Sequence, residues 1–126
     1  MSIEIKISEK RIPYKIAMRY LNKRVEEVKK GTNRELLWIL EHPTTYTAGV
    51  SFDKKEIIDK KIKIIKSNRG GKITLHNPGQ KIIYFVIDLN KRKKDIRKLI
   101  NSIEKSIIQF LKNYKIQSKK DKKGIK

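Results

Sequence analysis

Hydrophobic and polar residues alternate at the start of the chain and then change to a helical spacing. From Ile3 to Ile7, isoleucines alternate with charged residues, which predicts a half-buried strand. Pro13 stands where a helix can begin. Apolar residues follow it at steps of three and four positions, namely Tyr14, Ala17, Met18, Leu21, Val25 and Val28. This spacing predicts an amphipathic helix that ends near Lys30 and Gly31.

The middle of the chain contains short apolar runs separated by turn-forming residues. The run 36–40 is continuous and apolar, which predicts a central strand buried on both faces and ended by Pro43. Residues 44–49 form either a loop or a short strand, and residues 54–59 favour a helical turn. Further strands are predicted at three places, 62–65, 73–75 and 82–87, the last two on either side of the turn Asn77–Pro78–Gly79.

A second helical pattern fills the last third of the chain. Asp95 stands near its start, where a carboxylate complements the helix dipole. Its apolar face consists of Ile96, Leu99, Ile100, Ile103, Ile107, Phe110 and Leu111. Residues 119–126 are strongly basic, which predicts a disordered tail. This order of elements predicts a single α/β domain, with a mixed, largely antiparallel sheet and two long amphipathic helices.

Composition narrows the functional classes. The formal net charge is +20, which invites a nucleic-acid partner, but the seven arginines are scattered and no row of aromatic residues accompanies them. A non-catalytic basic protein that binds RNA or another anion therefore remains only the alternative. The chain has no cysteine, hence no disulfide and no thiolate metal site. No apolar run is long enough to span a membrane, so a cytoplasmic protein is expected.

The segment Arg69–Gln80 carries the most chemistry. Its two glycines permit positive φ and a close approach of the backbone to a ligand, and Arg69 offers a fork of donors beside them. Thr74 and His76 are two positions apart and face the same side of a strand. The alternative interpretation is an ordinary hairpin with a packed histidine. His42, in the sequence Glu-His-Pro, is expected to be hydrogen-bonded locally.

This segment resembles the signature of the octanoyl-acyl-carrier-protein:protein octanoyltransferases, the lipoate–protein ligase B type. That signature reads RGG, two residues, T, an aromatic, H, two residues, G, Q, and only Leu75 departs from it. The sequences Glu41–Pro43 and Tyr46–Gly49 also resemble this family. Related ATP-using ligases carry RGGG, then HD, then GN, whereas Asn77 and Gln80 stand at the corresponding positions here. The resemblance implies a fold like the biotin/lipoate protein ligase catalytic domain.

The resemblance also implies an activity. In this family an octanoyl group moves from acyl carrier protein to a lysine of a lipoyl domain, in 2-oxoacid dehydrogenase complexes or the glycine cleavage H protein. The transfer passes through a thioester on an enzyme cysteine with a lysine beside it, and no metal or cofactor is expected. The substrate-binding residues carried over are Arg69, Gly70, Gly71, Lys72, Ile73, Thr74, Leu75 and His76.

No catalytic residue is assigned, because the chain has no cysteine and none of its lysines stands in the matching motif. The thiolate is the nucleophile in such chemistry. The sequence is therefore expected to be the N-terminal part of a catalytic domain, incomplete at the C-terminus before the cysteine and lysine, and inactive alone.

Overall fold

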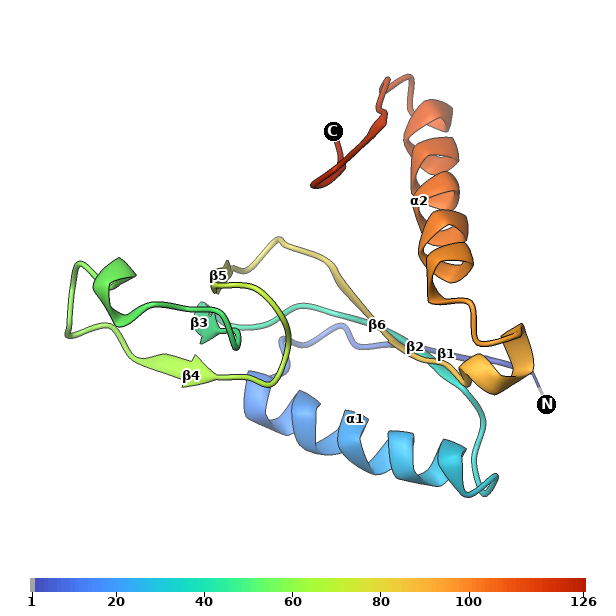
Figure 1. Ribbon diagram of the computed structural model, residues 1–126, viewed down its shortest axis with the longest axis horizontal. Helices are drawn as coiled ribbons and strands as arrows, with labels where there is room; N and C mark the ends of the chain where they lie inside the picture. The colour runs from blue at the N-terminus through green and yellow to red at the C-terminus, as the bar shows by residue number, and fades with distance from the viewer. Residues whose placement is uncertain (1) are drawn as a thin grey trace. The chain divides into compact units, whose positions relative to one another are not determined.

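A computed structural model describes residues 2–126 of the chain (Figure 1). By its internal contacts the chain falls into two compact units, one reaching to Ile87 and the other running from Asp88 to Lys126. The first unit contains two three-stranded sheets and helix α1 (Tyr14–Lys29). The second contains helix α2 (Ile96–Asn113) and a short hairpin. That both belong to one catalytic domain stays a prediction.

The first sheet has the order β1-β2-β6, with the continuous apolar run at its centre. Strand β2 (Leu36–Leu40) pairs in parallel with β1 (Glu4–Ile7) and antiparallel with β6 (Ile82–Val86). Leu36, Trp38 and Leu40 are buried, and the residues between them are only half-buried. The prediction of a central strand is confirmed, but burial is complete on one face alone.

Helix α1 covers the fully buried face of this sheet and forms the core with it. Ala17 and Leu21 pack with the buried side chains of β2 and with Val86. The helix begins directly after Pro13 and ends at Lys29, as its spacing predicts. Burying such an apolar stripe against a sheet is what stabilises a helix of this length in water.

Strand β1 is half-buried, as predicted, but its isoleucines lie on the exposed side. Ile5 and Ile7 are 65% and 67% exposed, whereas Glu4 and Lys6 are the half-buried residues of the strand. On the half-buried side, Glu4 forms an ion pair with Arg24 of α1, in which the atoms Oε2 and Nη1 are 2.7 Å apart. Arg24 is buried, and its apolar neighbour Val25 is 46% exposed.

The second sheet has the order β4-β3-β5 and lies in the same unit. Strand β3 (Thr45–Ala48) pairs in parallel with β4 (Ile64–Lys66) and antiparallel with β5 (Ile73–His76). The short helix η1 (Lys54–Glu56) lies between β3 and β4. The fold class is confirmed as α/β with mixed pairing, although the strands form separate sheets.

The turn between β5 and β6 matches the prediction. Gly79 has φ +87°, and the Gln80 amide donates to the Asn77 carbonyl at 3.1 Å. A positive φ at the third turn position requires glycine in this class of turn. The turn does not close a hairpin, since β5 and β6 belong to different sheets.

The second unit begins with the short helix η2 (Leu89–Arg92) and continues into α2. The Asp95 side chain accepts a hydrogen bond from the Lys98 amide and caps α2, which strengthens the predicted start. Within the described residues, no helix has the length and hydropathy needed to cross a membrane.

The basic end of the chain is folded in the structure. Strands β7 (Lys120–Asp121) and β8 (Gly124–Ile125) form an antiparallel hairpin, so the prediction of disorder for residues 119–126 is wrong. The Asp121 carboxylate accepts the Lys123 amide at 2.6 Å, and Gly124 has φ +123°. Turn-forming residues thus decide the local structure, although most of the neighbouring residues are lysines.

The buried ion pair of Arg24 leads to a stability prediction. Replacing Arg24 with Met keeps the apolar stem but removes hydrogen bonds to Glu4 and to Tyr20 at 2.7 and 3.0 Å. Because Glu4 keeps some access to water, we expect a loss of about 1–3 kcal/mol in the free energy of unfolding. Lys23→Met is the matched control, since its side chain is 79% exposed and should change stability by less than about 0.5 kcal/mol. Urea denaturation of both variants measures the difference, and equal effects would contradict the assignment.

Candidate functional site

The glycine-containing turn between β4 and β5 is held by the backbone that follows β3. Three successive amides of the segment Gly49–Ser51 donate to the carbonyls of Lys72, Arg69 and Gly71, at 2.9, 3.0 and 3.1 Å. The two sequence motifs that resemble the octanoyltransferases, one ending at Gly49 and one starting at Arg69, are therefore packed directly against each other.

Gly49 is required by this contact. A Cβ atom at position 49 would lie 2.3 Å from the carbonyl oxygen of Gly71 and 2.7 Å from that of Gly70, closer than real atoms approach. Gly71 has φ +86°, which a residue with a Cβ atom rarely adopts. A Cβ atom at Gly70, by contrast, would meet nothing within 4 Å. The turn thus has one packed side and one open side.

Arg69 fixes the turn from within the protein. Its Nη2 atom donates to the carbonyl and the hydroxyl of Thr47, both at 2.9 Å, and to the carbonyl of Lys72 at 3.0 Å. Its Nη1 atom donates to the carbonyl of Gly70 at 2.9 Å. The fork of donors predicted beside the glycines is directed at the protein's own oxygens, so Arg69 shapes the turn.

Four aromatic rings from four separate parts of the chain meet beside this turn. His76, at the end of β5, lies 5.6 Å from His42, which follows β2, measured between ring centroids. Tyr14, at the start of α1, lies 5.4 Å from His42 and 5.9 Å from His76. Tyr84 of β6 lies 5.8 Å from His42. The fold therefore brings both histidines of the sequence together.

His42 is fully buried and hydrogen-bonded on both ring nitrogens. Its Nδ1 atom lies 2.5 Å from the carbonyl oxygen of Ile12, and its Nε2 atom lies 2.8 Å from the hydroxyl of Tyr84. A carbonyl only accepts, so we assign the proton to Nδ1 and the acceptor role to Nε2. The expectation of local partners was wrong, because these residues are 30 and 42 positions away.

Burial keeps this cluster neutral. Desolvation lowers the pKa of His42 below its ordinary value, against the hydrogen bond to Ile12, which favours the charged ring. Burial raises the pKa of Tyr84 to about 12, so its hydroxyl keeps the proton that it donates to His42. The protonated phenol of Tyr84 therefore donates a hydrogen bond to the neutral imidazole of His42, and this bond stabilises the uncharged form of both groups.

One ring nitrogen of His76 has a hydrogen-bond partner, and the other has none among the described residues. Its Nε2 atom lies 3.3 Å from the hydroxyl oxygen of Thr47. Its Nδ1 atom is shielded from solvent and makes no hydrogen bond of ordinary geometry to any described residue. Burial lowers the pKa of His76, electrostatic interactions with His42 and with the Arg69 guanidinium lower it further, and the side chain of Gln80 acts in the opposite direction.

The eight residues predicted to bind substrate do not all face one side. Across the sheet Thr74 pairs with Thr47, and His76 pairs with Thr45, on the face that contacts Tyr14. The apolar residues of β5, Ile73 and Leu75, alternate with them and point to the other face. Lys72 forms an ion pair with Glu56 of η1. Their role in binding substrate stays a prediction.

Sequence reasoning missed the role of Tyr14 and Ser67. Tyr14 stood in the core-facing stripe of the first helix, but its hydroxyl donates to Ser67 Oγ at 3.0 Å. Ser67 Oγ also accepts the Arg69 amide at 3.3 Å and so joins the turn to the aromatic cluster. A tyrosine in the first helical turn is the available signal, because a buried tyrosine needs a partner for its hydroxyl.

The sequence matches one protein family and several known proteins over most of its length. Residues 13–124 match the family model described as the lipoyl protein ligase A/B catalytic domain. Over 98% of the chain, the sequence is 41% identical to an octanoyltransferase of Bartonella tribocorum and 38% identical to one of Wolbachia sp. subsp. Brugia malayi. These matches cover 51% and 62% of those relatives, so the chain spans about half to three-fifths of their length.

The packing around the turn predicts a sharp difference between two glycines. Gly49→Ala places a methyl group against the Gly71 carbonyl, and we expect a loss of about 1–3 kcal/mol in the free energy of unfolding. Gly70→Ala faces open space and should stay within about 0.5 kcal/mol of the wild type. Chemical denaturation of both variants tests this, and a neutral Gly49→Ala would disprove the contact.

The two buried histidines predict a pH dependence. Both pKa values are lowered by folding, so the unfolded chain binds protons first as the pH falls below about 6.5. Stability should be full above that pH and decline below it, by up to about 1.4 kcal/mol per pH unit for each histidine. Few other side chains titrate between pH 5.5 and 7. We expect His42→Asn to flatten this decline and the double variant with His76→Asn to remove it, as measured by denaturation at several pH values. An unchanged slope in the double variant would contradict this origin.

Proposed function

Because this chain belongs to the lipoyl protein ligase A/B catalytic-domain family, we propose that it is the acyl-thioester-binding part of an octanoyltransferase. The relatives named octanoyltransferase support this activity over the ATP-using ligases of the same family. The observation that carries the proposal is the glycine turn of Gly70 and Gly71, locked by Gly49 and Arg69 and open on its other side.

The open side of the turn suits a thioester carbonyl. Among the described residues, the amides of Gly70 and Gly71 donate no hydrogen bond to the protein. A carbonyl oxygen could accept from such amides, which are fixed in position before the ligand arrives. The absence of side chains at both positions lets the ligand come close. His76 lies next to this turn as a neutral ring, which adds no charge to a site for a neutral ester.

The proposed substrates follow from the family. The donor is octanoyl-acyl carrier protein and the acceptor is a lysine of a lipoyl domain. Octanoyl transfer through an enzyme thioester needs a thiolate, and none of the 126 residues is a cysteine. We therefore place the reacting thiol outside these residues, and with it the lysine that the family resemblance puts beside the thiol. The described chain binds and orients the thioester, and alone it should bind without turnover.

The test uses S-octanoyl-pantetheine, an uncharged thioester, and the 126-residue chain. Burial of the eight-carbon chain contributes up to about 6 kcal/mol, so pantetheine without the octanoyl group should bind far more weakly. Gly70→Leu fills the open side of the turn without a demanding backbone angle. We expect it to weaken thioester binding more than tenfold, measured by calorimetry, with unchanged thermal unfolding.

Two results would count against this proposal. If thioester binding is unchanged in Gly70→Leu, the ligand does not bind at the glycine turn. Equal affinity for pantetheine and its octanoyl thioester would show that no acyl group is recognised. Gly70→Ala, which adds only one methyl group in open space, is the matched control and should lose less than threefold.

A further inference from the structure

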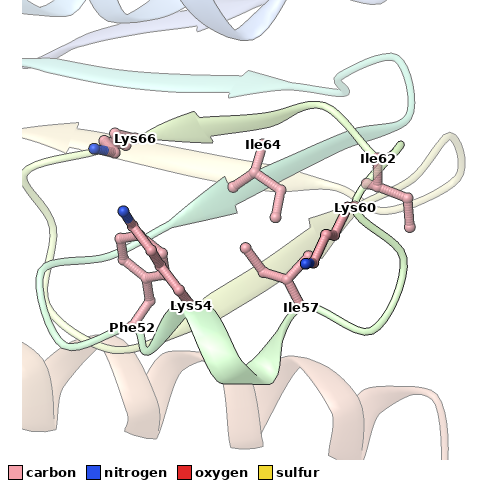
Figure 2. A pocket seen from close by; sticks show the side chains of 7 residues that line it. All are labelled: Phe52, Lys54, Ile57, Lys60, Ile62, Ile64 and Lys66. Carbon is pink, nitrogen blue, oxygen red and sulfur yellow. The ribbon is translucent and has the colours of Figure 1, made fainter.

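A separate pocket lies on the other face of the second sheet. It has a volume of about 350 Å³ and is formed by β4 and by the loop that precedes it (Figure 2). Ile64 of β4 pairs with Tyr46, which in turn pairs with Leu75. His76 is the next residue along β5 and pairs with Thr45. Because successive strand residues point to opposite faces, the pocket lies on the side away from His76.

The wall of this pocket is apolar. It is formed by four side chains, Phe52, Ile57, Ile62 and Ile64. Figure 2 shows Ile57 and Ile64 reaching toward each other across the space, from the loop and from β4. The volume falls in the lower part of the range of about 300–1,000 Å³ that small-molecule sites occupy. An aliphatic chain fits the chemistry of such a wall.

Three cations surround the same space, namely Lys54, Lys60 and Lys66. No acidic side chain lines it. In the described chain, no carboxylate lies within ion-pair distance of these lysines. The nearest acids along the sequence are engaged elsewhere: Asp53 and Asp59 accept backbone amides, and Glu56 pairs with Lys72. The pocket therefore offers an apolar wall with three lysines that no ion pair engages among the described residues.

We propose that this pocket binds an anionic amphiphile of medium chain length, of the chemical class of a fatty carboxylate. The aliphatic chain lies against the isoleucines and Phe52, and the anionic head lies among the three lysines. Neither feature alone selects this class: the apolar wall would accept a neutral chain, and the lysines would accept any anion. The site is distinct from the glycine turn and does not rest on the proposed octanoyltransferase function.

The first experiment varies the ligand on the 126-residue chain. Octanoate should bind about fifteen-fold more tightly than hexanoate, since each methylene contributes about fourfold. Octan-1-ol, which lacks the charge, should bind at least tenfold more weakly than octanoate at low salt. Calorimetry gives the affinities, and amide NMR shifts should be confined to residues 52–66. Equal binding of the alcohol, or shifts elsewhere only, would overturn the proposal.

Neighbouring residues supply matched variants. Ile57 lines the pocket, whereas Ile58 is 99% exposed and does not. Ile57→Asp should weaken octanoate binding more than tenfold, and Ile58→Asp less than twofold. Likewise Lys54→Glu should weaken it at least fivefold, and Lys55→Glu, in the same short helix, less than twofold. Lys54 is exposed, so its variant keeps the test decisive if Ile57→Asp does not fold, as judged by circular dichroism. Equal losses within either pair would overturn the assignment.

The two sites are separated by exchanging probes and variants. Gly70→Leu should leave octanoate binding unchanged, and Ile57→Asp should leave S-octanoyl-pantetheine binding unchanged. If Gly70→Leu abolishes octanoate binding, the pocket assignment fails while the turn remains the acyl site. If octanoate responds only to Ile57→Asp and the thioester does not respond to Gly70→Leu, the pocket stands and the proposed function fails.

Discussion

The contact between Gly49 and the turn at Gly71 is the constraint on which the candidate site depends. Three amides after β3 bond to the carbonyls of the turn, and this ladder has room only for glycine at position 49. The turn in turn needs a positive φ at Gly71 and the guanidinium of Arg69 inside it. The glycine at position 49, the positive φ at Gly71 and the hydrogen bonds of Arg69 depend on one another, so the two motifs form a single structural element.

This unit is joined to the core by rings that stay uncharged. Tyr14 begins the helix that covers the first sheet, stacks on His76, and bonds to Ser67 beside the turn. His42 is bonded at both nitrogens and fully buried, so a second proton on it would cost desolvation that the hydrogen bond to Ile12 only partly offsets. The cluster therefore holds the turn in place relative to the core, through packing and through hydrogen bonds between uncharged groups.

Hydrophobic spacing was enough to predict most elements, because helix and strand periods depend on local order. The central strand and both long helices were found in this way, and Asp95 correctly marked the start of the second. The half-buried side of β1 could not be found, since Glu4 faces an arginine twenty positions away. The partners of His42 were missed for the same reason. Residues of the candidate site were identified from the motif, but which of them shape the turn and which line its open side depends on contacts between distant segments.

The second sheet separates two chemically different surfaces. Its face toward α1 is polar and closed, with hydroxyls of Thr47 and Tyr14 around His76. Its other face is apolar and open, with Ile64 in a lysine-lined pocket. Strand alternation makes this division unavoidable, because β5 and β4 each contribute one residue in two to either side. The pocket is lined only by β4 and the loop before it, and none of its lining side chains belongs to the turn at Arg69–Lys72, so the two ligands would share no side chain. Independent recognition on two faces follows from the pleat of the sheet itself, while two short stretches of chain join the sites: the segment from Gly49 to Glu56 and the segment from Lys66 to Arg69.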